Sequence, residues 1–113
     1  MKKSIPTEDQ ESFAFAEMLR LKRYLFSHIA NEMQGTWGAR IRNKRMGMTR
    51  GFPDYAILKK NELVFVEMKR QSGGKVSDEQ QAWIDGLNRI GGVRAGVCRG
   101  AEEAIRFVKS RSK

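Results

Sequence analysis

Cysteine, histidine and long apolar runs are scarce in this sequence, and each absence excludes a class of protein. The single cysteine, Cys98, excludes an intramolecular disulfide framework, and we expect a buried, inert thiol in a reducing interior. The single histidine, His28, excludes a zinc site built from several histidines and is expected to be structural. No stretch approaches the roughly 20 apolar residues of a membrane span, and no apolar segment follows Met1-Lys2-Lys3-Ser4, so we expect neither a span nor a secretory signal. These features predict an intracellular, cytoplasmic protein.

Acidic residues are also under-represented. The 113 residues carry 22 Lys and Arg against 13 Asp and Glu, a formal charge of +9, which suggests a polyanionic partner. No acid occurs from Met33 through Pro53. We expect the basic residues there to contact phosphates without sequence preference, and the alternative is a solvated charged surface. The five residues are Arg40, Arg42, Lys44, Arg45 and Arg50.

A β-hairpin is predicted in the middle of the chain. Two apolar runs, Tyr55-Ala56-Ile57-Leu58 and Leu63-Val64-Phe65-Val66, flank polar turn residues. If Lys60-Asn61 forms a two-residue loop, the pairing places Asp54 opposite Glu67. A longer turn shifts the register by one residue, and the two carboxylates then become diagonal neighbours.

Three charged side chains converge at the open end of this hairpin. Like charges at opposed positions destabilise a sheet, so Asp54 facing Glu67 requires a bound cation to become favourable. Lys69 lies two residues after Glu67 and therefore points to the same face. Hard divalent ions such as magnesium prefer oxygen ligands of this kind. The alternative is an ordinary surface ion pair between Glu67 and Lys69.

The same residues carry a family resemblance. Pro53-Asp54 followed by Glu67-Met68-Lys69 resembles the PD-(D/E)xK nuclease signature. With the flanking residues, the chain resembles the VRR-NUC branch, whose members are small phage and bacterial proteins or the nuclease domain of a DNA-repair enzyme. The resemblance covers residues 8–108 and implies one domain over residues 1–113. The flanking residues are Gly51-Phe52, Ser77-Asp78-Glu79-Gln80, Trp83 and Leu87.

The resemblance also implies roles for individual residues in a Mg²⁺- or Mn²⁺-dependent hydrolysis of phosphodiester bonds. Asp54 and Glu67 would hold the metal, and the backbone carbonyl of Met68 would be a further ligand. Lys69 would orient or deprotonate the attacking water. Gln80 matches the family's site glutamine and also occupies the third position of a capping box opened by Ser77, and the two roles are compatible. The number of metal ions stays open.

A glutamate of the first helix completes the acidic site in the resembling family. Matching residues 13–21 to the first helix of that family favours Glu11 as this metal ligand, with Glu8 second. An ordinary first-turn acid that complements the helix dipole is the alternative for both.

The predicted fold is α/β, a restriction-endonuclease-like mixed sheet flanked by helices in the order α-β-α-β-β-α-β-α. Helices are expected over residues 8–25, 36–46, 77–90 and 100–109, and the strands outside the hairpin over residues 26–30 and 93–98. Trp37 is expected to pack in the core, with stacking on a base as the alternative.

The functional hypothesis is a DNA endonuclease selective for branched DNA such as Holliday junctions, in DNA repair or a phage-infected cell. The resemblance implies a homodimer, and Phe13, Leu21 and Tyr24 lie off the main apolar stripe of the first helix, where a partner would cover them. Arg70 and Lys75 would add to the DNA-binding residues. The alternatives are a non-catalytic basic DNA-binding module and a basic RNA-associated protein, neither of which needs the opposed carboxylates.

Overall fold

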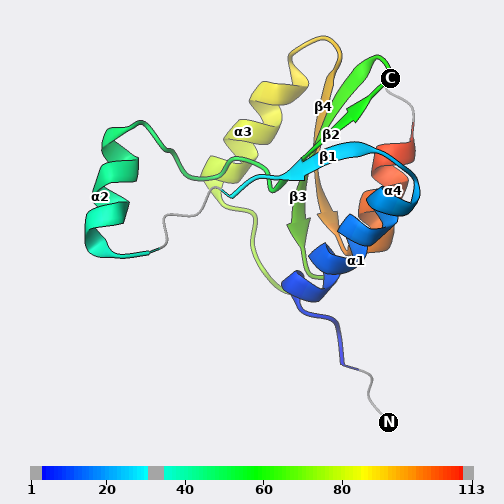
Figure 1. The fold of residues 1–113 in the computed structure, drawn as a ribbon, viewed down its shortest axis with the longest axis horizontal. Coiled ribbons are helices and arrows are strands. Elements are labelled where there is room, and N and C mark those ends of the chain that lie inside the picture. Colours follow the sequence, from blue (N-terminus) through cyan, green and yellow to red (C-terminus); the bar gives the residue numbers. More distant parts are fainter. Residues whose placement is uncertain (1–3, 31–34, 111–113) are drawn as a thin grey trace.

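The computed structural model describes residues 4–30 and 35–110, and it has the predicted order of elements (Figure 1). Residues 1–3, 31–34 and 111–113 lie outside the described residues. The elements are α1 (Glu8–Leu21), β1 (Leu25–His28), α2 (Trp37–Arg45), β2 (Tyr55–Lys59), β3 (Glu62–Lys69), α3 (Asp78–Asn88), β4 (Val93–Arg99) and α4 (Ala101–Lys109).

The four strands form one mixed sheet in the order β1-β2-β3-β4. The first two pairings are antiparallel, and β3 pairs with β4 in parallel through the crossover that contains α3. Lys59 faces Glu62 and Tyr55 faces Val66, which confirms the two-residue loop at Lys60-Asn61. One position beyond this ladder, Asp54 and Glu67 come to the same end of the hairpin.

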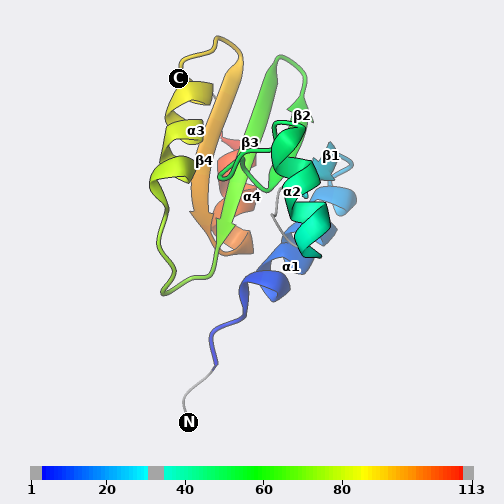
Figure 2. The ribbon, with the colours of Figure 1, turned by 90° about the vertical axis from the view of Figure 1, so that its left-hand side faces the viewer.

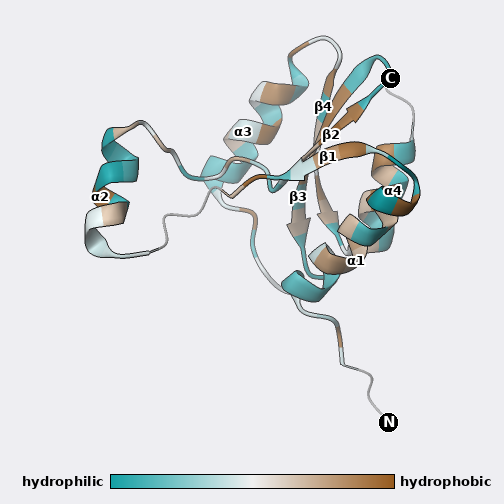
Figure 3. Ribbon diagram, viewed as in Figure 1, coloured by the Kyte–Doolittle hydropathy of each residue, from teal (hydrophilic) through white to brown (hydrophobic). Residues whose placement is uncertain are grey.

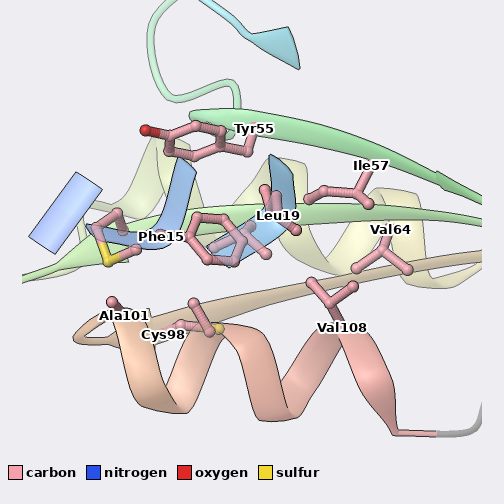
Figure 4. Packing of buried hydrophobic residues seen from close by; sticks show 11 residues of the cluster. Phe15, Leu19, Tyr55, Ile57, Val64, Cys98, Ala101 and Val108 are labelled. Atoms are coloured by element: carbon pink, nitrogen blue, oxygen red, sulfur yellow. The ribbon is translucent and has the colours of Figure 1, made fainter. Parts of the chain in front are cut away.

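Helices cover both faces of the sheet. α1 and α4 pack on one face and α3 on the other, as the two perpendicular views show (Figures 1 and 2). Phe15 and Leu19 of α1 and Val108 of α4 meet Ile57 and Val64 of the hairpin in a core without solvent exposure (Figure 4). A smaller cluster lies under α3 and contains Phe65, Ile84 and Ala95.

The side-chain pattern explains this division. In β2 the buried Tyr55 and Ile57 alternate with the half-buried Ala56 and the exposed Leu58, as expected for a strand with one covered face. In β3 all five residues from Val64 to Met68 are buried, because helices cover both sides of this central strand. Cys98 is buried in the larger cluster, and burial raises the pKa of its thiol to about 12, as expected for an inert thiol.

α1 ends earlier than predicted, at Leu21 instead of residue 25. Arg23 adopts a left-handed backbone conformation with φ of 61°. Its N–H donates to the carbonyl of Arg20, and the next N–H, of Tyr24, donates to Leu19. This is a Schellman ending, in which glycine is the usual left-handed residue. Because an arginine occupies that position here, the sequence did not indicate where the helix ends.

α2 stands apart from the sandwich (Figure 1), and none of its residues is buried. Figure 3 shows apolar residues concentrated on the strands, whereas α2 is predominantly hydrophilic. The prediction that Trp37 packs in the core is wrong, since its side chain is 76% exposed. The physical reason is that, among the described residues, no helix or strand packs closely on this short, strongly basic helix.

Within the described residues, no helix combines the length and the apolar character that a bilayer crossing requires.

Candidate active site

A cavity of about 490 Å³ lies at the open end of the hairpin, between the start of α1, the end of β1 and the start of α3. All four residues predicted to be catalytic line it: Asp54, Glu67, Lys69 and Gln80. They come from the entry to β2, from β3 and from α3, so the fold brings together residues that lie up to 26 positions apart in the printed sequence.

Asp54 and Glu67 form a largely buried pair of carboxyl groups. The Glu67 side chain is 4% exposed, and one carboxylate oxygen of Asp54 accepts a hydrogen bond of 2.8 Å from the backbone N–H of Met68. Burial raises the pKa of Asp54. Burial, and secondarily the negative charge of Asp54, raises the pKa of Glu67 to about 8. The pair therefore retains a proton near neutral pH unless a cation compensates its charge.

Lys69 supplies part of that compensation. Its ammonium nitrogen lies 3.9 Å from Glu67 Oε2 and lowers the pKa of Glu67, against the larger effect of burial. The predicted ion pair between Glu67 and Lys69 is thus present but is not a solvated surface pair, because the lysine side chain is only 12% exposed. When both carboxyl groups are ionised, the single ammonium leaves a net negative charge that a cation would offset.

The donor set fits a hard divalent cation. Two carboxyl groups point into one cavity, and both provide oxygen atoms, which Mg²⁺ and Mn²⁺ prefer. Across residues 4–30 and 35–110, no three His, Cys, Asp or Glu side chains gather closely enough to complete a site alone. Magnesium usually takes one or two protein carboxylates and fills its remaining positions with water and phosphate oxygens.

Gln80 completes the predicted capping box and also contacts the buried glutamate. Its side-chain oxygen accepts from the backbone N–H of Ser77 at 3.0 Å, and the Ser77 hydroxyl accepts from the Gln80 N–H at 3.1 Å, which completes the capping box. Its side-chain nitrogen donates to Glu67 Oε2 at 3.0 Å. The cap therefore fixes the orientation of an amide whose other end holds the buried glutamate.

Gly51 fastens the hairpin entry to the same helix. Its φ is +96°, and a Cβ at this position would lie 2.6 Å from the carbonyl carbon of Glu79 and 2.7 Å from the nitrogen of Gln80. Only glycine permits this approach of two backbones. The segment that carries Asp54 is thus held against the first turn that carries Gln80.

The structure reverses the sequence preference between the two glutamates of α1. Glu8 lines the cavity and Glu11 does not. The Glu11 carboxylate is instead turned toward the start of α4, where one oxygen accepts from the Ala101 N–H at 3.1 Å and the other from the Gln71 amide at 2.8 Å. The Glu11 oxygens thus stabilise a helix start in this structure, and the metal-ligand role of Glu11 stays a prediction.

This contact of Glu11 has a structural reason. The first residue before α4 is Gly100, which has no side chain to cap the helix. Glu11 provides the missing acceptor, and its negative charge suits the positive end of the helix dipole. The Gly100 N–H in turn donates to the carbonyl of Lys69 at 3.0 Å, so this network also fixes the end of β3.

His28 lines the cavity and was not singled out for the site by the sequence. Its ring lies 5.0 Å from that of Tyr55, the residue directly opposite it in the antiparallel pairing. His28 and Asp54 both line the cavity, and the positive charge of His28, when protonated, lowers the pKa of Asp54. The sequence did contain one signal for this position. His28 lies two residues after the inward-facing Phe26, and residues at that spacing in a strand share a face.

The predicted DNA-binding residues lie outside the cavity. Those of the basic stretch are exposed on α2 and on the segment that follows it: Arg40, Arg42, Lys44, Arg45 and Arg50. Arg70 and Lys75 are exposed on the loop after β3. The Arg99 guanidinium holds this loop by donating to the carbonyls of Gly73 at 2.6 Å and Gly74 at 3.1 Å.

Comparison with known proteins agrees with this geometry. Residues 7–102 match the VRR-NUC domain family, which is most of the chain. The chain belongs to the VRR-NUC family. A solved structure named "VRR_NUC domain protein" has the same fold, with a TM-score of 0.69 and 21% identity over 94% of this chain and 88% of that one. No curated protein matches the sequence.

Membership in the VRR-NUC family gives the chain its general function. The family is a nuclease domain, so a nuclease-type action on DNA follows for this chain. The predicted resemblance and the predicted fold class are both confirmed.

Proposed function

We propose that this VRR-NUC protein is a Mg²⁺- or Mn²⁺-dependent DNA endonuclease that hydrolyses phosphodiester bonds in the cavity at the end of the hairpin. The observation that carries the proposal is the buried pair Asp54 and Glu67 with Lys69 3.9 Å from Glu67. A basic DNA-binding module gains nothing from these two carboxyl groups, because in ionised form they repel phosphate and the charge of Asp54 raises the pKa of Glu67.

Asp54 and Glu67 would hold the divalent cation, with the Met68 carbonyl as a further oxygen and with Glu8, which lines the same cavity, acting through a bridging water. A bound cation of this type neutralises developing phosphate charge and lowers the pKa of a bound water. Lys69 orients the attacking water, accepts or relays its proton, and offsets the charge of the scissile phosphate. Gln80 holds Glu67 in position through the hydrogen bond of 3.0 Å.

The exposed basic residues would hold the DNA backbone around this cavity. α2 carries Arg40, Arg42, Lys44 and Arg45 at its surface, and no described residue of this helix is buried. Such contacts supply affinity without reading sequence. Arg50, Arg70 and Lys75 would extend the same surface to the cavity mouth. The buried unpaired thiol of Cys98 is compatible with action in the reducing cytoplasm.

We further propose a homodimer that cuts branched DNA such as a Holliday junction, since two symmetric cuts require two sites related by a two-fold axis. Leu21 is 83% exposed, and Leu25 and Leu58, which face each other across β1 and β2, are 71% and 52% exposed. These side chains offer a partner apolar surface. Tyr24, expected there as well, packs against the core instead.

The test compares cleavage of a four-way junction, a linear duplex and a single strand, with and without Mg²⁺ or Mn²⁺. Asp54→Asn, Glu67→Gln and Lys69→Ala should each abolish cleavage, while circular dichroism shows that the fold survives. Full activity in one of these variants would remove that residue from the mechanism. Retained DNA binding without cleavage under every metal condition would instead support the non-catalytic module.

Oligomeric state is measured separately by light scattering at micromolar concentration. A dimer should have twice the chain mass of 12.9 kDa. A monomer that cuts linear duplex and junction equally would contradict both the dimer and the junction preference. A dimer without junction preference would contradict the substrate alone.

A further inference from the structure

A second cavity of about 560 Å³ lies beside the first one, between α1 and the strands β1 and β2. Asp9, Ser12 and His28 line both cavities, so the second is a continuation of the first along the surface of α1. The proposed reaction accounts for the first cavity and leaves the second without a role.

Its walls combine aromatic rings with a cation. Phe13, Phe26 and Tyr55 line it together with Arg20, whose guanidinium lies 5.8 Å from the centre of the Phe26 ring. Phe13 is 68% exposed, so its large apolar ring is available to a ligand in this cavity. Stacking surfaces beside a cation are the features by which proteins bind single nucleotides of a strand.

The cavity is built into rigid elements. The contributing residues of α1 lie at positions 9, 12, 13, 16 and 20, which is the spacing of one helical face. The Tyr55 hydroxyl donates to the Ser12 carbonyl at 3.3 Å and so ties the strand wall to the helix wall. The cavity therefore exists before any ligand binds, as most small-molecule sites do.

We propose that this cavity is a nucleotide subsite, which seats the nucleotide next to the scissile phosphate of a DNA strand. Its base stacks on Phe13, and Arg20 contacts its phosphate. A strand that places a phosphate at Asp54 and Glu67 must continue in both directions, and the connected cavity is one continuation. The Asp9 carboxylate at the border accepts hydrogen bonds, so it favours the amino edge of a base there over another phosphate. This subsite rests on the proposed nuclease function.

A second copy of the chain is the rival occupant. Charge favours the nucleotide as the occupant. The chain carries a formal charge of +9, and the second cavity presents Arg20 next to the first cavity, which, as proposed, accepts phosphate. The exposed leucines Leu21, Leu25 and Leu58 do not line this cavity. They leave a separate surface for a dimer partner.

The test measures binding of a fluorescein-labelled single strand and four-way junction by anisotropy, with Ca²⁺ replacing Mg²⁺ so that binding does not depend on cleavage. Phe13→Ala and Arg20→Ala should each weaken binding about ten-fold, the loss typical of one stacked base. Ile90→Ala and Arg106→Ala are matched controls outside the cavity and should leave affinity unchanged. Unchanged affinity in both test variants would overturn the subsite.

Position is tested by photo-crosslinking from p-benzoylphenylalanine introduced in place of Phe13. The expected product is a crosslink to the nucleotide beside the cleavage position. A crosslink to a second copy of the chain, or a Phe13→Ala variant that dissociates a dimer, would assign the cavity to the partner and overturn the proposal. If the wild-type protein cleaves no DNA, the nuclease proposal fails, while the anisotropy and the crosslinked product still decide whether the cavity binds a nucleotide.

Discussion

Replacing Glu67 with glutamine should stabilise the metal-free protein at alkaline pH. The pKa of Glu67 is raised to about 8 in the folded chain, against an ordinary value of 4.5. Between these two pH values the unfolded chain has released the proton that the folded chain retains, so a rise in pH favours unfolding. Glutamine cannot ionise, and Glu67→Gln removes this contribution while it keeps the shape of the side chain and an acceptor for Gln80.

The expected magnitude is large for a domain of this size. Each pKa unit corresponds to about 1.4 kcal/mol, so titration of Glu67 alone should lower the free energy of unfolding by on the order of 4 kcal/mol from pH 5 to pH 8.5. The total free energy of unfolding of a typical domain is only about 5–15 kcal/mol. The pKa of Asp54 is also raised, so its ionisation acts in the same direction. Excess Mg²⁺ binds the ionised pair and should largely remove the pH dependence.

The assay is urea unfolding followed by circular dichroism from pH 5 to pH 8.5, for wild type and Glu67→Gln, with EDTA or with Mg²⁺. The upper limit keeps the buried thiol of Cys98 out of the titration, because its ordinary pKa is 9.0. Glu62→Gln is the matched control, since the Arg94 guanidinium lowers the pKa of Glu62 and its loss should not flatten the curve. Parallel curves for wild type and Glu67→Gln would refute the buried-carboxylate reasoning.

Two further perturbations follow from the geometry. Changing the five basic residues on and after α2 to alanine should weaken the salt dependence of DNA binding. The slope of log affinity against log salt should fall by about 0.9 per lost phosphate contact. The control is an Arg106→Ala, Lys109→Ala double variant, and an equal slope in the two proteins would contradict the role of the five residues. Gly51→Ala should destabilise the protein by roughly 2–4 kcal/mol in urea unfolding, because the new Cβ meets the α3 backbone at 2.6 Å. Gly47→Ala shares the positive φ but meets nothing within 4 Å, so equal losses in the two variants would show that the close approach is unimportant.

Local sequence patterns were sufficient for much of the fold and for the centre of the site. The two apolar runs and the short polar turn defined the hairpin register, which in turn placed Asp54 and Glu67 at one end. The Ser77 and Gln80 capping box marked the start of α3 and made the second contact of Gln80 compatible with it. These features depend on residues near one another in the chain, and their geometry follows from strand alternation and helix-cap chemistry.

Other decisions required the tertiary structure. Glu8 and Glu11 lie one helical turn apart, and nothing local distinguishes a carboxylate that enters the cavity from one that caps α4, 90 positions along the chain. Trp37 has the large apolar side chain of a core residue, yet its burial depends on whether another element packs over α2, and no helix or strand of the described chain packs closely there. Hydrophobicity and helix propensity are properties of a segment, whereas burial and hydrogen-bond partners are properties of the packed chain, which is why the sequence determined the elements and the structure decided these side chains.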